Sequence, residues 1–275
     1  MRTIPASELI VNGDGTVFHL HMRPDQLAQK VILVGDPGRV PMVSGRFSEI
    51  ECSGGNREFV WATGNDRMTV LSTGIGSDNI DIVMNELDAL VNVDLETRRP
   101  RSDRNSLTIV RLGTSGALQA DIELGSFVMS SWSIGIDPLA RFYKVCATAV
   151  EEAFMKHMGW PANLSRPYVI ESSSMLRRRF EPIASVGFTL SAPGFYAPQG
   201  RWLTLEPEIA DFIPRLESFN IEMESSSIGM LSALMGHQAI TVCLIIAQRH
   251  AQLSDVDYTG AMDTMVASAL ACLAD

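Results

Sequence analysis

The sequence predicts an α/β protein that folds as a single domain over residues 1–275. Apolar strand-like runs alternate with segments of helical length, which is typical of this fold class. Hydrophobic residues make up 46% of the 275 residues, which is enough for a substantial core. No second compositional regime begins along the chain, so we expect one domain rather than two.

Several apolar runs are short enough to be strands. They cover residues 31–34, 68–72, 107–112, 127–131, 168–170, 185–190 and 239–246. Apolar residues at helical spacing predict helices as well. These cover residues 78–91, 145–158, 225–235 and 259–273, with Ser77 or Asp78 capping the first. Residues 94–106 are polar, lack periodicity and contain a proline, so we expect an inserted surface loop.

Charge and composition exclude several classes of protein. The net charge of −10 argues against general nucleic-acid binding, because the phosphate backbone attracts basic surfaces. No segment approaches the ~20 unbroken apolar residues of a membrane span, and the amino terminus lacks a signal-peptide core. We therefore expect a cytoplasmic protein. The four cysteines are widely scattered, which fits neither a disulfide scaffold nor a zinc site, so we expect reduced thiols.

Three predicted strands end in glycine-containing turns that suit an anion. The segments are Gly35-Asp36-Pro37-Gly38-Arg39, Thr73-Gly74-Ile75-Gly76 and Arg111-Leu112-Gly113-Thr114-Ser115-Gly116. Glycine lets backbone amides approach a ligand, and the planar fork of arginine binds two oxygens at once. Neither a dinucleotide-binding G-x-G-x-x-G nor the Gly-Lys-Ser/Thr of a P-loop is present. Taken singly, each segment is also open to interpretation as a structural turn, with any arginine in a salt bridge.

Four motifs, in their order along the chain, resemble those of the nucleoside phosphorylase family. They are Gly35-Asp36-Pro37-Gly38-Arg39, Ser72-Thr73-Gly74-Ile75-Gly76, Arg111-Leu112-Gly113-Thr114-Ser115-Gly116 and Glu222-Met223-Glu224-Ser225. Two further stretches are similar to those of the uridine phosphorylases in that family. They are Val17-Phe18-His19-Leu20 and Phe195-Tyr196-Ala197-Pro198-Gln199-Gly200-Arg201. The resemblance extends from about Val17 to Arg249.

This resemblance implies a fold and an activity. The fold is a single-domain, three-layer α/β/α structure with a mixed, twisted central sheet. The activity is that of a pentosyltransferase: the reversible phosphorolysis of uridine to uracil and α-D-ribose 1-phosphate in pyrimidine salvage.

The resemblance also implies which residues bind phosphate. They are Gly35, Arg39, Arg57, Arg111 and Thr114, with Arg57 supplied by the neighbouring subunit. Three arginines would hold the dianion by charge-assisted hydrogen bonds and orient it for attack on the ribose. Without the family resemblance, an exposed salt bridge would be the preferred interpretation of Arg57.

Roles toward the ribose are implied for a second set, which comprises His19, Thr114, Met223 and Glu224. His19 matches a histidine that reaches the 5′-hydroxyl from the adjacent protomer. Glu224 matches a carboxylate that binds the 2′- and 3′-hydroxyls. Its hydrogen bonds can strengthen as the ring becomes oxocarbenium-like, which would stabilise the transition state.

Contacts with the base are implied for Gly116, Phe195, Gln199, Arg201, Glu222 and Arg249. Gln199 offers a donor and an acceptor for the imide N3–H and a carbonyl. Arg201 can neutralise the negative charge that spreads onto O4 as the glycosidic bond breaks. The residues implied to carry the catalysis are Arg111, Glu224, Arg201 and Gln199.

The implied chemistry requires no metal and no organic cofactor, with inorganic phosphate as co-substrate. In some relatives, residues matching Glu58, Ile75 and a serine form a potassium site between subunits. Asn79 stands in place of that serine here, which puts the site in doubt. Sharing His19 and Arg57 between subunits implies a homo-oligomer, either a dimer or a hexamer built as a trimer of dimers.

Three alternatives remain open. A purine nucleoside phosphorylase is the nearest, but purine-specific relatives carry a Ser-Asp pair where Ala247-Gln248-Arg249 stands here. A hydrolytic nucleosidase of the same fold would need no phosphate clamp, which Arg39, Arg57 and Arg111 argue against. A non-catalytic nucleoside-binding protein of this fold would need neither the arginines nor Glu224.

Overall fold

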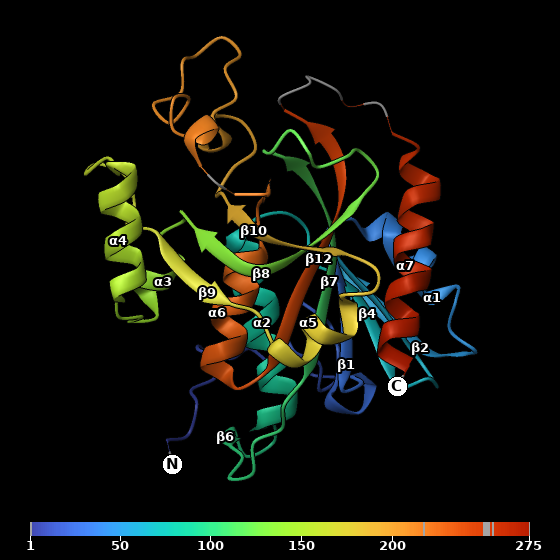
Figure 1. The fold of residues 1–275 in the computed structure, drawn as a ribbon. Coiled ribbons are helices and arrows are strands. Elements are labelled where there is room, and N and C mark those ends of the chain that lie inside the picture. Colours follow the sequence, from blue (N-terminus) through green and yellow to red (C-terminus); the bar gives the residue numbers. More distant parts are fainter. Residues whose placement is uncertain (1, 217, 250–253, 255, 275) are drawn as a thin grey trace. The chain divides into compact units, whose positions relative to one another are not determined.

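The chain divides into two compact units, and Figure 1 labels the helices and strands that they contain. The structure, a computed structural model, describes residues 2–216, 218–249, 254 and 256–274. Unit 1 comprises residues 1–110 and 231–238, and unit 2 comprises residues 111–230 and 239–275. Both units contain parallel and antiparallel strand pairs, so the predicted α/β class with a mixed sheet is confirmed. The single domain stays a prediction.

The strands of unit 1 bring two of the predicted glycine turns to the same edge. These strands are β1 (Lys30–Val34), β2 (Ile50–Asn56), β3 (Phe59–Gly64) and β4 (Met68–Ser72). β1 and β4 pair in parallel, whereas β3 runs antiparallel to β4 and β2 antiparallel to β3. Val34 lies opposite Ser72, so the turns at Gly35 and Gly74 follow neighbouring carboxyl ends. Ligands of α/β sheets bind at such ends.

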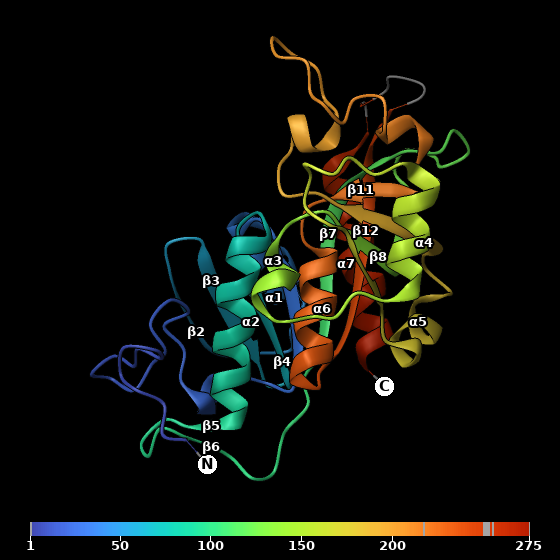
Figure 2. The same cartoon turned by 90° about the vertical axis from the view of Figure 1, so that its left-hand side faces the viewer.

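Helix α2 (Ser77–Asn92) lies against the strands of unit 1 (Figure 2). Its buried apolar residues recur at helical spacing, as predicted: Ile80, Val83, Met84, Leu87 and Leu90. The residue before the helix is Gly76, with φ of 98°, and no side chain caps it. The predicted cap at Ser77 or Asp78 is therefore wrong, because the chain enters α2 through a conformation that favours glycine. The short α1 (Val40–Ser44) packs against β3 and β4.

The segment predicted as an inserted loop lies between α2 and β7. It is not irregular throughout, because β5 (Val93–Asp94) pairs antiparallel with β6 (Arg99–Pro100). Arg104 Nη2 donates hydrogen bonds to Asp88 Oδ1 at 3.0 Å and to the carbonyl oxygen of Met235 at 2.9 Å. These contacts anchor the segment within unit 1.

Five strands of unit 2 form a closed ring. They are β7 (Thr108–Ala117), β8 (Phe127–Gly135), β10 (Ser185–Ser191), β11 (Asn220–Glu222) and β12 (Gln238–Gln248). β7 begins in unit 1, and its residues 111–117 belong to unit 2. In the order β11, β10, β8, β12, β7 each strand is hydrogen-bonded to the next, and β11 also pairs with β7. β9 (Tyr168–Glu171) pairs antiparallel with β8.

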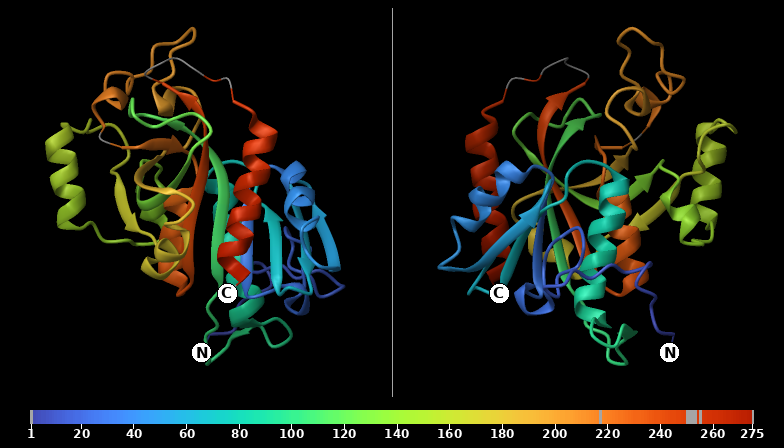
Figure 3. Two further views of the ribbon diagram at one scale, coloured as in Figure 1. Left: turned by 45° about the vertical axis from the view of Figure 1, so that its right-hand side comes forward. Right: turned by 180° about the vertical axis from the view of Figure 1, so that it is seen from behind.

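The helices after β8 include one that begins later than predicted. They are α3 (Leu139–Phe142), α4 (Ala149–Met158), α5 (Ser174–Phe180), α6 (Ser225–Met235) and α7 (Tyr258–Ala274). α4 starts at Ala149 because Thr148 and Glu151 form a capping box. Figure 3 shows α7, in red, as a long helix ending near the carboxyl terminus. Among the described residues, no helix is long and apolar enough to cross a membrane.

Short 3₁₀ turns complete the backbone, at Pro24–Gln26, Pro37–Arg39, Ala197–Gln199 and Ile213–Arg215. All four cysteines are free. This agrees with the thiols expected from their scattered positions.

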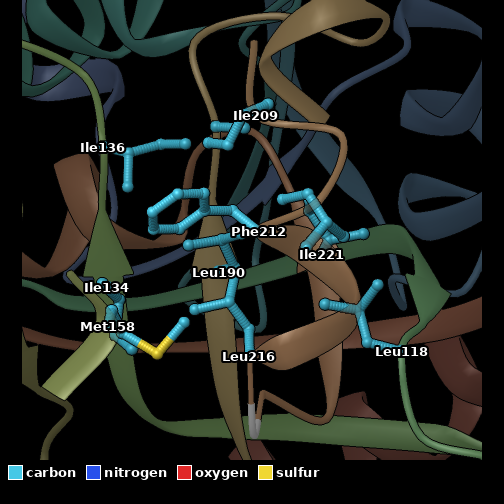
Figure 4. Close-up of a cluster of buried hydrophobic side chains, with 11 residues drawn as sticks. Leu118, Ile134, Ile136, Met158, Leu190, Ile209, Phe212, Leu216 and Ile221 are labelled. Atoms are coloured by element: carbon cyan, nitrogen blue, oxygen red, sulfur yellow. The ribbon is translucent and has the colours of Figure 1, made fainter. Parts of the chain in front are cut away.

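An apolar cluster fastens the long segment between β10 and β11 to the strands of unit 2. It contains Leu118, Ile134, Ile136, Met158, Leu190, Ala192, Ile209, Phe212, Ile213, Leu216 and Ile221. Figure 4 shows Phe212, from the long segment, among Ile136, Leu190 and Ile221. Burial of these side chains stabilises the segment that carries Gln199 and Arg201.

Candidate active site

Arg111 on β7 lies in a buried cluster of charges. Its side chain is 5% exposed, and those of Glu222 and Glu224 are 1% and 5% exposed. Arg111 Nη1 lies 3.0 Å from Glu222 Oε2, and Arg111 Nη2 donates a hydrogen bond to Glu224 Oε2. Nη1 also lies 3.5 Å from the sulfur of Cys243 on β12. The guanidinium is therefore held between two carboxylates and a thiol.

The protonation states of this cluster follow from burial and pairing. Burial lowers the pKa of Arg111, but the carboxylates of Glu224 and Glu222 outweigh it and raise the pKa above its ordinary value. Arg111 therefore stays charged. Burial raises the pKa of the Cys243 thiol to about 12, so this group is neutral.

Two nitrogens of the Arg111 guanidinium have partners, whereas the third has none in the part of the chain that the structure describes. Its Nε is buried and has no hydrogen-bond partner among the described residues. An unsatisfied buried donor costs roughly 1–3 kcal/mol. An anionic acceptor placed at this N–H would recover that cost.

Glu222 joins Arg111 to the start of helix α6. Its two oxygens accept the backbone N–H of Ser225 at 3.1 and 3.0 Å, and Oε2 accepts that of Glu224 at 2.9 Å. Ser225 Oγ donates to Oε1 at 2.6 Å. The first N–H groups of a helix have no acceptor inside it, so Glu222 satisfies them. The base contact predicted for Glu222 stays a prediction.

A second polar group in unit 2 surrounds Gln199. The backbone carbonyl of this buried residue accepts a hydrogen bond from Arg249 Nη1, and Arg249 Nη2 donates to the carbonyl of Gly200 at 3.4 Å. Arg201 Nη2 donates to Gln199 Oε1 at 3.4 Å. The guanidinium carbon of Arg201 lies 4.1 Å from the centre of the Phe195 ring. Phe195 is thus stacked on Arg201.

The surroundings of the two arginines of this group disfavour their positive charges. Burial lowers the pKa of Arg201. Burial also lowers the pKa of Arg249, and the charge of Arg201 lowers it further. Nε of Arg201 is buried without a hydrogen-bond partner in the described part of the chain. A ligand atom carrying negative charge would stabilise both guanidinium charges and could accept the hydrogen bond of the Arg201 Nε–H.

Strand β7 connects these two polar groups. Gly116 lies opposite Ile221, which precedes Glu222, and the Arg249 N–H donates to the carbonyl of Ala117 at 3.1 Å. Thr114 and Met223 are half-buried. Unit 2 thus carries, on β7 and the segments around it, Arg111, Thr114, Gly116, Phe195, Gln199, Arg201, Glu222, Met223, Glu224 and Arg249.

In unit 1, Gly35 and Arg39 lie side by side. Asp36 Oδ1 accepts the N–H of Gly38 at 2.8 Å, which holds the turn that leads to Arg39. A Cβ at Gly35 would lie 4.0 Å from Arg39 Nη2 and 3.6 Å from the carbonyl oxygen of Gly74. An oxyanion beside Gly35 would therefore be within reach of the Arg39 guanidinium.

His19 is held by Glu86, a residue that the sequence interpretation missed. Glu86, on the buried face of α2, lies 2.6 Å from His19 Nδ1 and accepts the backbone N–H groups of His19 and Leu20. Because a carboxylate only accepts, Nδ1 carries the proton and Nε2 is the ring nitrogen left for a ligand. The sequence indicates this contact only through the position of Glu86, a carboxylate on the apolar face of α2.

Arg57 lies at the tip of the β2–β3 hairpin. Asn56 pairs with Phe59, so Arg57 and Glu58 form the two-residue turn. Arg57 is exposed, has φ of 55°, and forms no ion pair with another described residue. The predicted phosphate clamp combines Arg39 and Arg57 of unit 1 with Arg111 of unit 2, and it stays a prediction.

The residues of the doubtful potassium site lie around Gly74. A Cβ at Gly74 would lie 2.3 Å from Asn79 Nδ2 and 3.1 Å from Glu58 Cγ, and Ile75 is 68% exposed. No three His, Cys, Asp or Glu side chains are grouped to hold a metal ion in the described ranges. The potassium site stays a prediction.

Comparison with known proteins identifies the family. A model of the phosphorylase superfamily matches residues 29–274. Uridine phosphorylase of Thermococcus kodakarensis is 27% identical over 245 residues, which cover 86% of this chain and 79% of that protein. A DeoD-type purine nucleoside phosphorylase of Streptococcus suis is 23% identical over 236 residues, covering 83% and 85% of the two chains.

A solved structure agrees with this match. The nucleoside phosphorylase of Trypanosoma brucei, whose crystal structure shows uridine phosphorylase activity, superposes with a TM-score of 0.85 at 27% identity. The superposition covers 97% of this chain and 98% of that one. The chain therefore belongs to the phosphorylase superfamily.

Proposed function

We propose that this protein catalyses the reversible phosphorolysis of uridine, giving uracil and α-D-ribose 1-phosphate, as a step of pyrimidine salvage. The observation that carries the proposal is Arg111, buried beside Glu224 with an Nε–H that has no partner among the described residues. The similarity to uridine phosphorylase of Thermococcus kodakarensis and to the Trypanosoma brucei enzyme supports a pyrimidine substrate.

The proposed reaction begins from bound phosphate. A phosphate oxygen forms a bond to C1′ of the ribose while the bond from C1′ to N1 of uracil breaks, and its electron pair stays on the base. Arg111 would donate its buried Nε–H to the phosphate, with Gly35, Arg39 and Thr114 binding other oxygens. Arg57 of the neighbouring subunit would complete the clamp. Fixing the nucleophile in this way lowers the entropic part of the barrier.

Glu224 would act on the ribose. Its carboxylate would accept hydrogen bonds from the 2′- and 3′-hydroxyls and stabilise the positive charge that develops on the ring. Met223 would pack against the sugar. His19, with Nδ1 bound to Glu86, would bind the 5′-hydroxyl through Nε2 from the adjacent subunit. The proposal therefore requires at least a dimer.

Gln199 and Arg201 would bind uracil. The amide of Gln199 can donate to a carbonyl and accept from N3–H, and Arg201 carries the charge needed beside O4. The pKa values of Arg201 and Arg249 are lowered, so their charges would be stabilised by a ligand that becomes negative, as uracil does when it leaves. Gly116 and Phe195 would line the same pocket.

The end of β12 argues against a purine substrate. Ala247-Gln248-Arg249 offers no carboxylic acid that could protonate N7 of a purine. Gln248 Nε2 donates to the carbonyls of Gln119 and Ile122 at 2.6 and 3.1 Å, so its amide binds the backbone. This observation favours uridine over inosine.

A substrate panel tests the proposal. The protein is mixed with uridine, deoxyuridine, thymidine or inosine, with and without phosphate, and base release is followed by ultraviolet absorbance. We expect uracil from uridine when phosphate is present and no release when it is absent. Addition of a chelator is expected to leave the rate unchanged, because the proposed chemistry uses no metal. Cleavage without phosphate would indicate a nucleosidase, and cleavage of inosine alone a purine phosphorylase.

A further inference from the structure

The buried carboxylate of Glu222 makes two kinds of contact. Oε2 lies 3.0 Å from Arg111 Nη1 and accepts the N–H of Glu224 at 2.9 Å. Oε1 accepts the hydroxyl of Ser225 at 2.6 Å. The carboxylate thus ties the guanidinium on β7 to the backbone of the residues that begin α6. Its side chain is 1% exposed, so water does not compete for these contacts.

The orientation of Arg111 depends on this contact. Glu222 and Cys243 engage Nη1, whereas Glu224 engages Nη2. Without the carboxylate of Glu222, Glu224 would be the remaining charged partner of Arg111 in this cluster. A guanidinium in that position tends to bind a carboxylate through two parallel N–H groups. Arg111 would then turn toward Glu224, and both groups would be withdrawn from substrate.

We propose that Glu222 is a positioning residue for the phosphorolysis, rather than a ligand of the base. It holds Arg111 through Nη1, which keeps the Nε–H directed at phosphate and prevents Arg111 from binding Glu224 in bidentate fashion. The inference rests on the proposed function. It assigns Glu222 a role that acts through Arg111 and Glu224.

The test compares Glu222→Gln with the wild-type protein. The amide keeps the size of the side chain but removes the charge that faces Arg111. We expect the dissociation constant for inorganic phosphate, measured by calorimetric titration, to rise roughly tenfold or more. The KM for phosphate should rise with it. If Glu222 served only to cap α6, Glu222→Gln would lower the melting temperature and leave phosphate affinity unchanged.

Ser225→Ala is the matched control. It removes the hydroxyl that binds Oε1 and leaves the contact between Glu222 and Arg111 in place. We expect a lower melting temperature with phosphate affinity within about twofold of wild type. The proposal is overturned if Glu222→Gln leaves phosphate affinity unchanged, or if both variants weaken it equally.

Two further outcomes, misfolding of the variant and inactivity of the wild-type protein, also decide the proposal. If Glu222→Gln does not fold, Glu222→Asp is titrated instead, because it keeps the charge at a shorter reach. Weaker phosphate binding by Glu222→Asp supports the proposal, and wild-type affinity overturns it. If the wild-type protein releases no base from any nucleoside, the proposed function is wrong. The phosphate titration, which needs no turnover, still decides whether Glu222 positions Arg111.

Discussion

The guanidinium of Arg111 lies directly over Gly113. A Cβ at Gly113 would lie 2.2 Å from Arg111 Nη1 and 2.7 Å from Arg111 Cζ. The two residues are neighbours on one face of β7, because side chains alternate along a strand. Glycine at 113 is therefore required by the position of Arg111, and through it by the contacts with Glu222 and Glu224.

Gly113→Ala should displace Arg111 and impair phosphorolysis. We expect kcat/KM to fall at least about 100-fold, the effect of losing one preorganised charge-stabilising donor. Overpacking should also lower the free energy of unfolding by about 1–3 kcal/mol. Steady-state kinetics with uridine and phosphate measure the first effect, and urea unfolding measures the second. Gly13→Ala is the control, because no described atom outside its two chain neighbours lies within 4 Å of its Cβ position. Full activity of Gly113→Ala would contradict this prediction.

Gly35→Ala should behave differently. Its Cβ would be in ordinary contact, 3.6 Å from the nearest protein atom, so we expect the melting temperature to stay near that of wild type. The new methyl group would occupy space beside Arg39 Nη2, where a phosphate oxygen is expected. The KM for phosphate should rise about tenfold, the loss of one charge-assisted hydrogen bond, with little change in the KM for uridine. Initial rates at varied phosphate concentrations measure this KM. An unchanged KM for phosphate would show that Gly35 does not contact phosphate.

Arg249→Met should weaken binding of the base selectively. Arg249 donates to the carbonyls of Gln199 and Gly200, and these bonds fix the segment that carries Gln199 and Arg201. We expect the KM for uridine to rise about tenfold, while the KM for phosphate stays near wild type. Arg178→Met, at an exposed position on α5, is the matched control. Equal increases in both KM values would argue for general destabilisation instead.

The buried carboxyl group of Asp137 should make the stability of the folded protein depend on pH. It is 2% exposed and accepts hydrogen bonds from Tyr168 Oη at 2.8 Å, Ser226 Oγ at 3.5 Å and the Leu139 N–H at 2.8 Å. Burial outweighs these bonds and raises the pKa of Asp137 above its ordinary value of 3.8. Its stabilising contribution is therefore complete below pH 3.8 and is lost as the pH rises through the raised pKa.

Asp137→Asn removes this ionisation with a side chain of the same shape. We expect the variant to be more stable than wild type at pH 8, with the difference shrinking toward pH 4. Denaturant unfolding across that pH range measures it. A variant that is less stable at pH 8 would show that the hydrogen bonds to the carboxylate outweigh its burial.

Much of the fold could be predicted from local pattern. β1 and β4 are continuous apolar runs, and α2, α6 and α7 have regular apolar spacing or composition, so their ends were predicted to within one residue. β2 was missed because its residues are mostly exposed and include two glycines, and β11 because it has three residues. Neither leaves a periodic signal.

The candidate site divides in the same way. Motif order brought Arg111 and Glu224 into one prediction, and the structure places them in contact. The link between Glu86 and His19 joins residues 67 positions apart, which no local pattern reveals. The anchoring contacts of Glu222 and the space above Gly113 also depend on how β7 meets β11 and α6. Sequence motifs indicated which residues bear chemistry, whereas their supporting contacts required the tertiary structure.

The stoichiometry of the sugar product tests the proposed phosphorolysis most directly. Uridine and phosphate are incubated with the protein, and uracil and ribose 1-phosphate are quantified together, the second by phosphorus NMR. Phosphorolysis predicts one ribose 1-phosphate for each uracil, and no uracil when phosphate is omitted. Uracil release without ribose 1-phosphate, or no release from uridine at all, would contradict it.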